Sequence, residues 1–385
     1  MNEKKIRVVL IGPGFPFRGG IAHYTTLLFE NLKRTTRVTF YSFKRQYFQF
    51  LFPGKSDRDV SRYPISSSGM HRVLDTLNPI SWIKTGRLSR SADLIIIPWW
   101  VSFWAPYYYV FLLFARTPKN LVFFLCHNVI EHETNPLTKA VTRFLLRKGD
   151  GFMVHSLKEK KLLQNIIGKK HPPVAVSPHP TYQIFDRAAE NQVSARKKLD
   201  LREDQHVILF FGFIRKYKGL YYLIRALPET IRRLPDLVLL IVGECWEGEE
   251  RYLELIRKLS LEKNVRFINK YVPNEDVEIY FKSADFVILP YVAGTGSGIL
   301  QLSFGMEKPV IASRTEVFQD IVEENKTGLF APPQNSQKLA EAILKMYDKN
   351  LVPVFTKNIR RNNERFSWEK MVESIFSLYD KGKKP

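Results

Sequence analysis

The chain has 385 residues, of which 45% are hydrophobic, 25% are charged and 13% are aromatic. This composition excludes a disordered chain and a fibre, because enough apolar area is present to build large cores. At roughly 150 residues per domain, the length predicts two to three domains, and two is the starting hypothesis. The 59 lysines and arginines exceed the 38 aspartates and glutamates, and the net charge of +21 makes a polyanionic partner one hypothesis.

The excess charge lies in the first half of the chain. Residues 1–187 carry 28 basic and 11 acidic side chains, whereas the remainder carries 31 and 27. The two cysteines, Cys126 and Cys245, are too few and too far apart for a disulfide framework or a cysteine metal site, which fits a cytoplasmic protein. The N-terminus lacks the long apolar region of a signal peptide, and prolines interrupt the apolar stretch from Leu94 to Phe114, so no spanning helix is expected.

Short apolar runs alternate with amphipathic stretches from the start of the chain. We expect a first helix over Ala22–Leu32 and strands at Arg7–Gly12, Arg37–Phe43, Asp93–Trp99, Leu121–Cys126 and Gly151–Val154. Near-continuous apolar strands separated by helices predict a parallel sheet covered on both faces.

A break in this pattern follows, near residues 178–191, where two prolines occur and the periodicity is lost. The second half then repeats the alternation, with strands expected at 206–212, 237–243, 265–269, 284–290 and 309–313 and helices at 220–233, 249–259, after 298 and at 336–347. The predicted fold class is α/β, with two doubly wound, Rossmann-like domains, residues 1–187 and 188–360, facing across a cleft. In such sheets ligands bind outside the carboxyl ends of the strands.

Two glycine-rich turns follow predicted strands. Gly19 and Gly20 precede the first helix, where a backbone without side chains can approach a phosphate or a sugar hydroxyl. Plain turn chemistry is the alternative for this pair. The second turn contains Gly294, Thr295, Gly296, Ser297 and Gly298 and opens a helix, a pattern typical of a diphosphate-binding turn.

Cations and a histidine also lie at predicted strand ends. Arg215 and Lys218 follow the first strand of the second domain, where they would neutralise a leaving phosphate, although exposed cations are usually only solvated. His127 follows the strand ending at Cys126, and it is the first polar candidate of the first domain. His155 and His179 are interpreted as structural. No metal-binding motif is present, so no cofactor or metal is expected.

The ordered set of motifs resembles the family-four (group 1) retaining glycosyltransferases of GT-B architecture over essentially the whole chain. The matching segments are Gly19–Thr25, Cys126–Asn128, Ile214–Leu227, Leu239–Glu244, Asn264–Tyr291, Gly294–Ser313 and Asn325–Ile343. The resemblance implies transfer of a hexose from a nucleotide diphosphate sugar, bound mainly by the C-terminal domain, to an acceptor bound mainly by the N-terminal domain. It also implies that the segment from Arg361 to residue 385 returns as a helix onto the first domain.

Residue by residue, the resemblance assigns three roles. Gly19 and Gly20 match glycines that approach the donor phosphate or the acceptor, and Arg215 and Lys218 match the basic pair that stabilises the leaving diphosphate. His127 matches a histidine near the transferred sugar. Transfer would retain the anomeric configuration without a metal.

The chain departs from the family at two kinds of position. Two glutamates that are common in the family are replaced by Thr295 and Ser303, and Phe213 stands where the family's arginine is usual. We therefore expect a variant donor loop of Gly294, Thr295, Gly296, Ser297 and Gly298, together with Ser303. A donor site without activity is the alternative.

The basic first half suggests docking at an anionic membrane, with a lipid-diphosphate-linked saccharide as acceptor and the inner face of the membrane as location. The candidate cations are Lys44, Arg45, Lys55, Arg58, Arg62, Arg72, Lys84, Arg87 and Arg90, and the aromatic residues among them are Tyr47, Phe48, Phe50, Phe52 and Trp82. Trp99 and Trp100 could add to the contact, although aromatic residues after a strand are equally often part of the core. An ordinary basic insertion is the alternative.

The expected product is a surface polysaccharide or glycolipid. Three other functions stay open: a GT-B epimerase or hydrolase acting on a nucleotide sugar, a degenerate binding protein, and, more distantly, a nucleic-acid-binding protein suited to the +21 charge. No nucleic-acid-binding motif accompanies the charge, so we expect no nucleic-acid partner.

Overall fold

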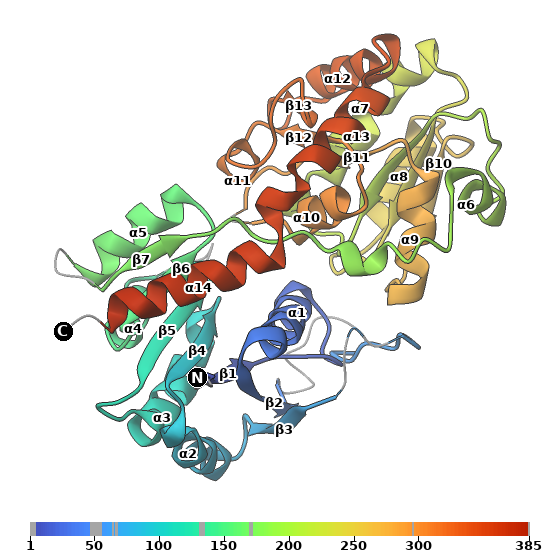
Figure 1. Ribbon diagram of the computed structural model, residues 1–385. Helices are drawn as coiled ribbons and strands as arrows, with labels where there is room; N and C mark the ends of the chain where they lie inside the picture. The colour runs from blue at the N-terminus through green and yellow to red at the C-terminus, as the bar shows by residue number, and fades with distance from the viewer. Residues whose placement is uncertain are drawn as a thin grey trace. The chain divides into compact units, whose positions relative to one another are not determined.

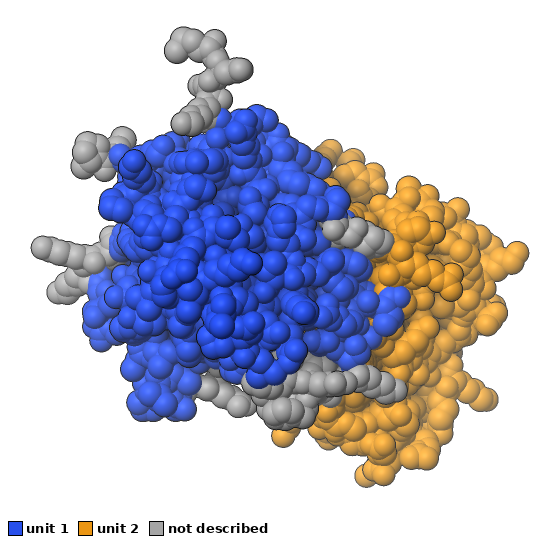
Figure 2. Space-filling model, turned by 90° about the horizontal axis from the view of Figure 1, so that it is seen from below, with its two compact units in different colours: residues 1–60, 64–180, 366–385 blue, residues 61–63, 181–365 orange. Residues whose placement is uncertain are grey.

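The computed structural model describes residues 5–46, 56–63, 65, 68–130, 135–168, 172–294 and 296–383. The chain divides into two compact units, coloured blue and orange in Figure 2. Unit 1 comprises residues 1–60, 64–180 and 366–385, and unit 2 comprises residues 61–63 and 181–365. The chain thus passes into unit 2 after Pro180, a few residues before the expected boundary at 187, and its last helix belongs to unit 1.

Unit 1 is built on a parallel sheet of seven strands within the described residues, in the order β3-β2-β1-β4-β5-β6-β7 (Figure 1). The strands are β1 (Arg7–Gly12), β2 (Arg37–Arg45), β3 (Met70–Asp75), β4 (Leu94–Trp99), β5 (Leu121–Cys126), β6 (Gly151–Val154) and β7 (Val174–Val176). The outermost strands, β3 and β7, are absent from our sequence-based predictions. β3 is mostly exposed and β7 has three residues, so neither has the long apolar run of an inner strand.

Helices cover both faces of this sheet. Its helices are α1 (Gly20–Thr35), α2 (Pro79–Leu88), α3 (Ala105–Ala115), α4 (Pro136–Leu146), α5 (Leu157–Ile167) and α14 (Trp368–Gly382). Successive residues of β1 point to opposite faces: Val9 and Ile11 join a core with side chains from α2 to α5, whereas Val8 and Leu10 join a core with α1 and α14. The chain's last helix therefore completes the second core of unit 1.

Unit 2 repeats the architecture with six parallel strands among the described residues, in the order β10-β9-β8-β11-β12-β13. The strands are β8 (Val207–Phe211), β9 (Val238–Val242), β10 (Val265–Ile268), β11 (Phe286–Leu289), β12 (Val310–Ser313) and β13 (Gly328–Ala331). The helices are α6 (Gln192–Lys198), α7 (Leu220–Arg233), α8 (Glu250–Lys258), α9 (Asn274–Ser283), α10 (Gly298–Gly305), α11 (Glu316–Gln319), α12 (Ser336–Asp348) and α13 (Leu351–Asn362). The strands and helices predicted for this half are confirmed.

The strand order reverses once in each sheet. In unit 1 the reversal lies between β1 and β4, and in unit 2 it lies between β8 and β11. At such a point the two flanking loops leave in opposite directions and open a crevice at the carboxyl ends of the strands. The glycines after β1, the cations after β8 and the glycine-rich turn after β11 all follow strands that flank these two points.

Candidate functional site

Two loops of unit 2 are held together beside the strand reversal. One follows β8 and includes the short 3-10 helix η5 (Lys216–Lys218), and the other follows β11. The Val292 N–H donates a hydrogen bond of 2.7 Å to the carbonyl of Tyr217. Gly219 has a left-handed φ of 70°, and a Cβ there would overlap the carbonyl of Pro290. The loops therefore pack backbone against backbone, which only glycine permits at this position.

Lys218 is the buried cation of this site. Its side chain is inside the packed loops, with the residue only 7% exposed, and its Nζ lies 5.7 Å from the centre of the Tyr291 ring. The ammonium makes no ion pair with any carboxylate in the described parts of the chain. Burial, followed by the charge of Arg215, lowers the pKa of Lys218 to about 7. When Lys218 is protonated, the site thus holds a positive charge that no carboxylate among the described residues balances.

Arg215 lies beside it on the exposed side of the loop. Its guanidinium is 5.6 Å from the centre of the Trp246 ring and 5.7 Å from that of Tyr217, and Trp246 also packs on Phe213 with ring centres 4.4 Å apart. Trp246 lies in the loop after β9 and was missed by sequence reasoning. Its position just after a buried strand was the signal that could have identified it.

The glycine-rich turn leads into α10 and is tied to the same loops. The Ser297 hydroxyl accepts a hydrogen bond from the Leu300 N–H at 3.2 Å, capping the helix, and donates to the Tyr291 hydroxyl at 3.3 Å. Gly294 has a φ of 151°, which strains any other residue, and a Cβ at Gly296 would meet no described atom within 4 Å. Open space therefore borders the start of α10. Thr295 lies outside the described residues.

Two further donor-loop residues face inward. Gly298 packs near Tyr182, whose ring would be 3.7 Å from a Cβ at this position. Ser303 is fully buried, and its hydroxyl donates to the carbonyl of Ile299 at 2.7 Å. The hydroxyl thus satisfies the helix backbone and has no exposed surface, and the donor contact expected of Ser303 stays a prediction.

In unit 1, Gly19 and Gly20 form the start of α1. Gly19 has a φ of 105°, and a Cβ at either glycine would meet no described atom within 4 Å. The loop before them is braced from two sides: the Arg72 guanidinium donates to the carbonyl of Phe15 at 3.2 Å, and the Arg58 guanidinium lies 4.1 Å from the centre of the Phe17 ring. Two contacts thus hold the loop before the helix, and the helix starts beside open space.

His127 follows β5 and belongs to a cluster of three histidines around Tyr24. The His127, His155 and His179 rings lie 4.5, 5.5 and 4.8 Å from the Tyr24 ring, centre to centre. His127 and His155 each keep a buried Nε2 that has no hydrogen-bond partner among the described residues. His155 and His179, which sequence reasoning treated as structural, thus lie beside the candidate.

Burial keeps these imidazoles neutral. It lowers the pKa of His155 to about 4 and that of His179 to about 3, the latter also through the charge of His155. The pKa of His127 falls well below its usual value, by burial first and then by the two neighbouring histidines. A neutral imidazole donates through one nitrogen and accepts through the other, so the His127 Nε2 suits a hydroxyl or a phosphate oxygen.

The loop that carries His127 is fixed by a buried carboxylate. The backbone N–H of Val129 donates to Glu159 Oε2 at 2.8 Å, and the backbone N–H of His127 donates to the carbonyl of Trp99 at 2.8 Å. Burial raises the pKa of Glu159, opposed by the hydrogen bond from Val129. Glu159 is therefore a positioning residue for the loop, and sequence reasoning did not identify it.

The cations proposed for membrane docking do not share one environment. Lys44 is exposed, Arg45 pairs with Asp75 at 3.6 Å, and Arg87 lies 5.4 Å from the centre of the Phe114 ring. Arg58, besides stacking on Phe17, donates to the carbonyl of Lys44 at 2.7 Å. Of the neighbouring residues, Lys55, Tyr47, Phe48, Phe50 and Phe52 lie outside the described part of the chain.

The two tryptophans at the end of β4 differ. Trp100 is half-buried against the core, with its ring 5.8 Å from that of Trp104. Trp99 is 1% exposed and donates its indole N–H to the carbonyl of Val129 at 3.3 Å. This side chain is part of the core, which is the alternative interpretation of an aromatic residue after a strand, and its contact with an acceptor or a membrane stays a prediction.

Within the described residues, no group of three or more histidine, cysteine, aspartate or glutamate side chains is arranged to hold a metal ion. A search of the same residues for a helix long and apolar enough to cross a membrane finds none.

Comparison with known sequences bears on unit 2. Residues 191–365 match the family model described as glycosyl transferases group 1. A D-inositol 3-phosphate glycosyltransferase of Corynebacterium urealyticum is 32% identical over 202 residues, which are 50% of this chain and 46% of that protein. Spore coat protein SA of Bacillus subtilis is 22% identical over 53% of this chain and 56% of its own length. The chain thus matches about half the length of these curated relatives.

Solved structures match the whole architecture. A sucrose-phosphate synthase from Thermosynechococcus elongatus aligns over 98% of both chains with a TM-score of 0.75 and 21% identity. Anabaena HepE, solved in complex with UDP-glucose, aligns over 97% of this chain and 99% of its own with a TM-score of 0.74 and 16% identity. The predicted GT-B fold is confirmed, and residues 191–365 match the model of the group 1 glycosyl transferases.

Proposed function

We propose that this chain, whose residues 191–365 form a group 1 glycosyl transferase domain, transfers a hexose from a nucleotide diphosphate sugar to a saccharide or lipid-linked saccharide. The transfer retains the anomeric configuration, requires no metal, and serves the synthesis of a surface polysaccharide or glycolipid. The single observation that carries the proposal is Lys218, a buried ammonium without a counter-ion among the described residues.

An uncompensated buried charge destabilises a protein unless something balances it. At Lys218 the neighbouring cation is Arg215, which increases the imbalance. A diphosphate would supply the missing negative charge, with Arg215 reaching it from the exposed side. Two cations that stabilise a leaving diphosphate lower the barrier to breaking the bond between the sugar and the phosphate.

The turn before α10 supports the same ligand. The helix begins at Gly298 after a turn in which Gly296 borders open space, so backbone N–H groups and the helix dipole are available to a phosphate. The UDP and UDP-glucose complexes of Anabaena HepE make a uridine nucleotide the first donor to test.

Unit 1 offers groups for the sugar and the acceptor. In the proposed reaction His127, at the end of β5, lies near the transferred sugar, and the start of α1 at Gly19 and Gly20 admits the donor phosphate or the acceptor. The new glycosidic bond forms on the face from which the nucleotide leaves. The basic character of residues 1–187 supports work at the inner face of an anionic membrane.

Calorimetric titration with UDP, GDP and ADP, each in magnesium and then in EDTA, tests the donor site. We expect one nucleotide to bind the wild-type chain equally well in both conditions. Arg215→Ala and Lys218→Met should each weaken that binding by about 10- to 100-fold, the range expected for a lost charged hydrogen bond. Lys218→Met should not lower the melting temperature, because it removes a charge that the protein leaves unbalanced.

Lys263→Met, a change of an exposed lysine far along the chain from either loop, is the matched control and should bind like the wild type. Loss of stability in Lys218→Met without loss of nucleotide affinity would make Lys218 structural. Failure of the folded wild type to bind any nucleotide would indicate a degenerate donor site. A product that forms only with acceptor present would separate the transferase from an epimerase or a hydrolase.

A further inference from the structure

Helix α3 is an unusual surface helix. Its sequence, Ala105–Ala115, contains no charged side chain, and its polar groups are limited to three tyrosines. One side packs into the core through Tyr108 and Phe111. The other side is open: Leu113 is 60% exposed, and Tyr109 and Phe114 are half-buried. A helix that is apolar all round usually lies against something other than water.

The helices beside α3 are strongly basic. Together, α2, α4 and α5 carry seven lysines and arginines and a single carboxylate, Glu159, which is 6% exposed and holds the Val129 N–H. The exposed charge on these helices is therefore entirely positive. Exposed apolar side chains accompany it, including Ile80 at 70%, Leu137 at 71% and Phe144 at 49%.

Side-chain contacts join these helices into one surface, called the basic face below and defined as the outer side of α2, α3, α4 and α5. The Arg87 guanidinium of α2 lies 5.4 Å from the centre of the Phe114 ring of α3. The Tyr109 ring of α3 lies 5.0 Å from that of Phe144 of α4, and Lys148 Nζ lies 5.2 Å from the same Phe144 ring. Aromatic rings and cations thus alternate across neighbouring helices.

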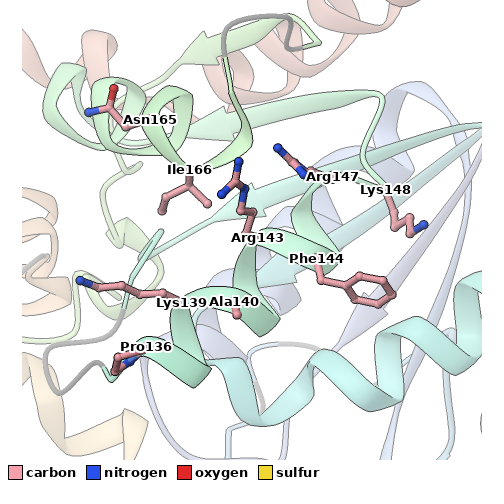
Figure 3. A pocket seen from close by; sticks show the side chains of 9 residues that line it. All are labelled: Pro136, Lys139, Ala140, Arg143, Phe144, Arg147, Lys148, Asn165 and Ile166. Carbon is pink, nitrogen blue, oxygen red and sulfur yellow. The ribbon is translucent and has the colours of Figure 1, made fainter.

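A groove between α4 and α5 concentrates the cations. It has a volume of about 940 Å³, and its lining includes Lys139, Arg143, Arg147 and Lys148 but no carboxylate. Figure 3 shows Arg143 and Arg147 extending from α4 toward the α5 side, where Ile166 lies. No carboxylate lies within ion-pair distance of Lys139, Arg143 or Arg147 in the described parts of the chain. The groove is suited to the phosphate of a headgroup.

We propose that the basic face docks unit 1 on an anionic phospholipid bilayer. The exposed apolar side chains of α3 and α4 enter the interfacial region, and the cations of α2, α4 and α5 contact lipid phosphates. This assignment differs from the sequence-based one, with which it shares Arg87 and Lys84 but not Lys44, Arg45, Arg58 or Arg72. It does not depend on the proposed transferase activity, since docking requires no donor.

The apolar component identifies the occupant. A soluble polyanion such as a nucleic acid would pair with the cations but would leave Leu113 and Phe144 in water. A bilayer interface satisfies both kinds of side chain at once, because phosphates and hydrocarbon lie within a few ångströms of each other.

Vesicle co-sedimentation tests the proposal, using the full chain and vesicles of phosphatidylcholine alone or mixed with phosphatidylglycerol at about 2:1. The wild type should bind the mixed vesicles, and it should bind the neutral vesicles weakly or not at all. Arg143→Gln/Arg147→Gln should weaken partitioning by about 30-fold, about fivefold for each cation lost at an anionic surface. Leu113→Ser/Phe144→Ser should reduce the binding that survives about 0.5 M salt, where charge attraction is screened.

Two double variants serve as controls. Arg257→Gln/Lys263→Gln removes two exposed cations from unit 2, and Lys44→Gln/Arg45→Gln removes two from the end of β2 in unit 1. Both should bind the vesicles nearly as the wild type does. A loss in either control equal to that of Arg143→Gln/Arg147→Gln would overturn the placement of the docking surface.

Three other outcomes would also overturn the proposal. In the first, the wild type fails to bind the mixed vesicles. In the second, Arg143→Gln/Arg147→Gln has no effect on vesicle binding. In the third, the chain binds an oligonucleotide more tightly than vesicles, and Leu113→Ser/Phe144→Ser does not change the oligonucleotide binding. UDP binding, measured in the same variants, should stay unchanged and report that they are folded. Vesicle binding without UDP binding would remove the transferase proposal and leave docking intact.

Discussion

Lys218 and Arg215 illustrate how two neighbouring cations acquire different properties. Arg215 is exposed, and its guanidinium lies near Trp246 and Tyr217. Lys218 is buried, and its pKa falls to about 7. Near neutral pH the free Lys218 side chain is therefore close to losing the second charge that a diphosphate requires.

This difference predicts how nucleotide binding depends on pH. Bound diphosphate favours the protonated ammonium and raises the pKa of Lys218, so binding is strongest below the free pKa of about 7. Above about pH 7 the affinity for UDP should fall by up to tenfold per pH unit, until the pKa of the complex is reached. Calorimetry in buffers with different ionisation enthalpies should detect one proton taken up on binding.

Lys218→Arg is the control for this dependence. Arginine keeps its charge, so the variant should bind UDP with little change in affinity above about pH 7 and without proton uptake. The same slope in the wild type and in Lys218→Arg would assign the pH dependence to another group.

Among the elements, the starts of α1 and α7 use glycine for opposite reasons. A Cβ at Gly219 would overlap the carbonyl of Pro290, so this glycine is required by packing between two loops. A Cβ at Gly20 would meet no described atom within 4 Å, so packing does not require glycine there. A position that tolerates a side chain yet carries none is consistent with a ligand that approaches the backbone.

Gly20→Ala should therefore fold normally, with a melting temperature within about 2 °C of the wild type, since alanine also favours a helix. Transferase turnover should fall by about tenfold or more if donor or acceptor reaches the start of α1. Gly219→Ala, the comparison variant, should lose both stability and nucleotide binding. Normal turnover in Gly20→Ala would remove this helix start from the proposed site.

At the level of the whole chain, unit 1 depends on residues far from it in sequence. Helix α14 contributes Met371, Ile375, Leu378 and Tyr379 to the core under β1, β4 and β5. At about 1.5–3 kcal/mol for each buried side chain, their loss would cost about 6–12 kcal/mol, which is comparable with the whole stability of a domain.

A chain that ends at Arg365 should therefore fail to fold unit 1. Limited proteolysis should cleave residues 5–180 rapidly, and thermal unfolding should lose the transition of that unit. A chain that ends at Gly382 keeps every core residue of α14 and should behave like the full-length protein. Protection of unit 1 in the shorter chain would show that α14 contributes little to its stability.

Local pattern in the chain was enough to predict most of the architecture. Buried parallel strands need continuous apolar runs, so β1, β4, β5, β8, β9 and β11 could be recognised in the sequence. Glycine-rich turns could also be recognised, because glycines such as Gly19 and Gly296 stand between an apolar strand and the start of a helix. The order of these motifs also predicted the GT-B fold, which the solved structures confirm, and a family whose model matches residues 191–365.

Residue environments depend instead on partners distant in the sequence. Ser303 and Trp99 were candidates by position, yet the first is fully buried on α10 and the second lies in the unit 1 core. Trp246, Glu159 and the histidine cluster were missed because their neighbours come from other strands and helices. Burial also lowers the pKa of Lys218, and no local pattern records burial.

The basic face also combines a property visible in the sequence with properties that only the folded chain shows. Its charge was visible as a basic first half of the chain, but counting cannot tell which cations are paired. Folding ties Arg45 to Asp75 and Arg58 to the loop after β1. It also brings α2 to α5 together around an apolar helix, with arginines that have no carboxylate partner among the described residues. Sequence periodicity is set by nearest neighbours and so predicts elements, whereas charge pairing, burial and surface shape arise from long-range contacts that exist only in the folded chain.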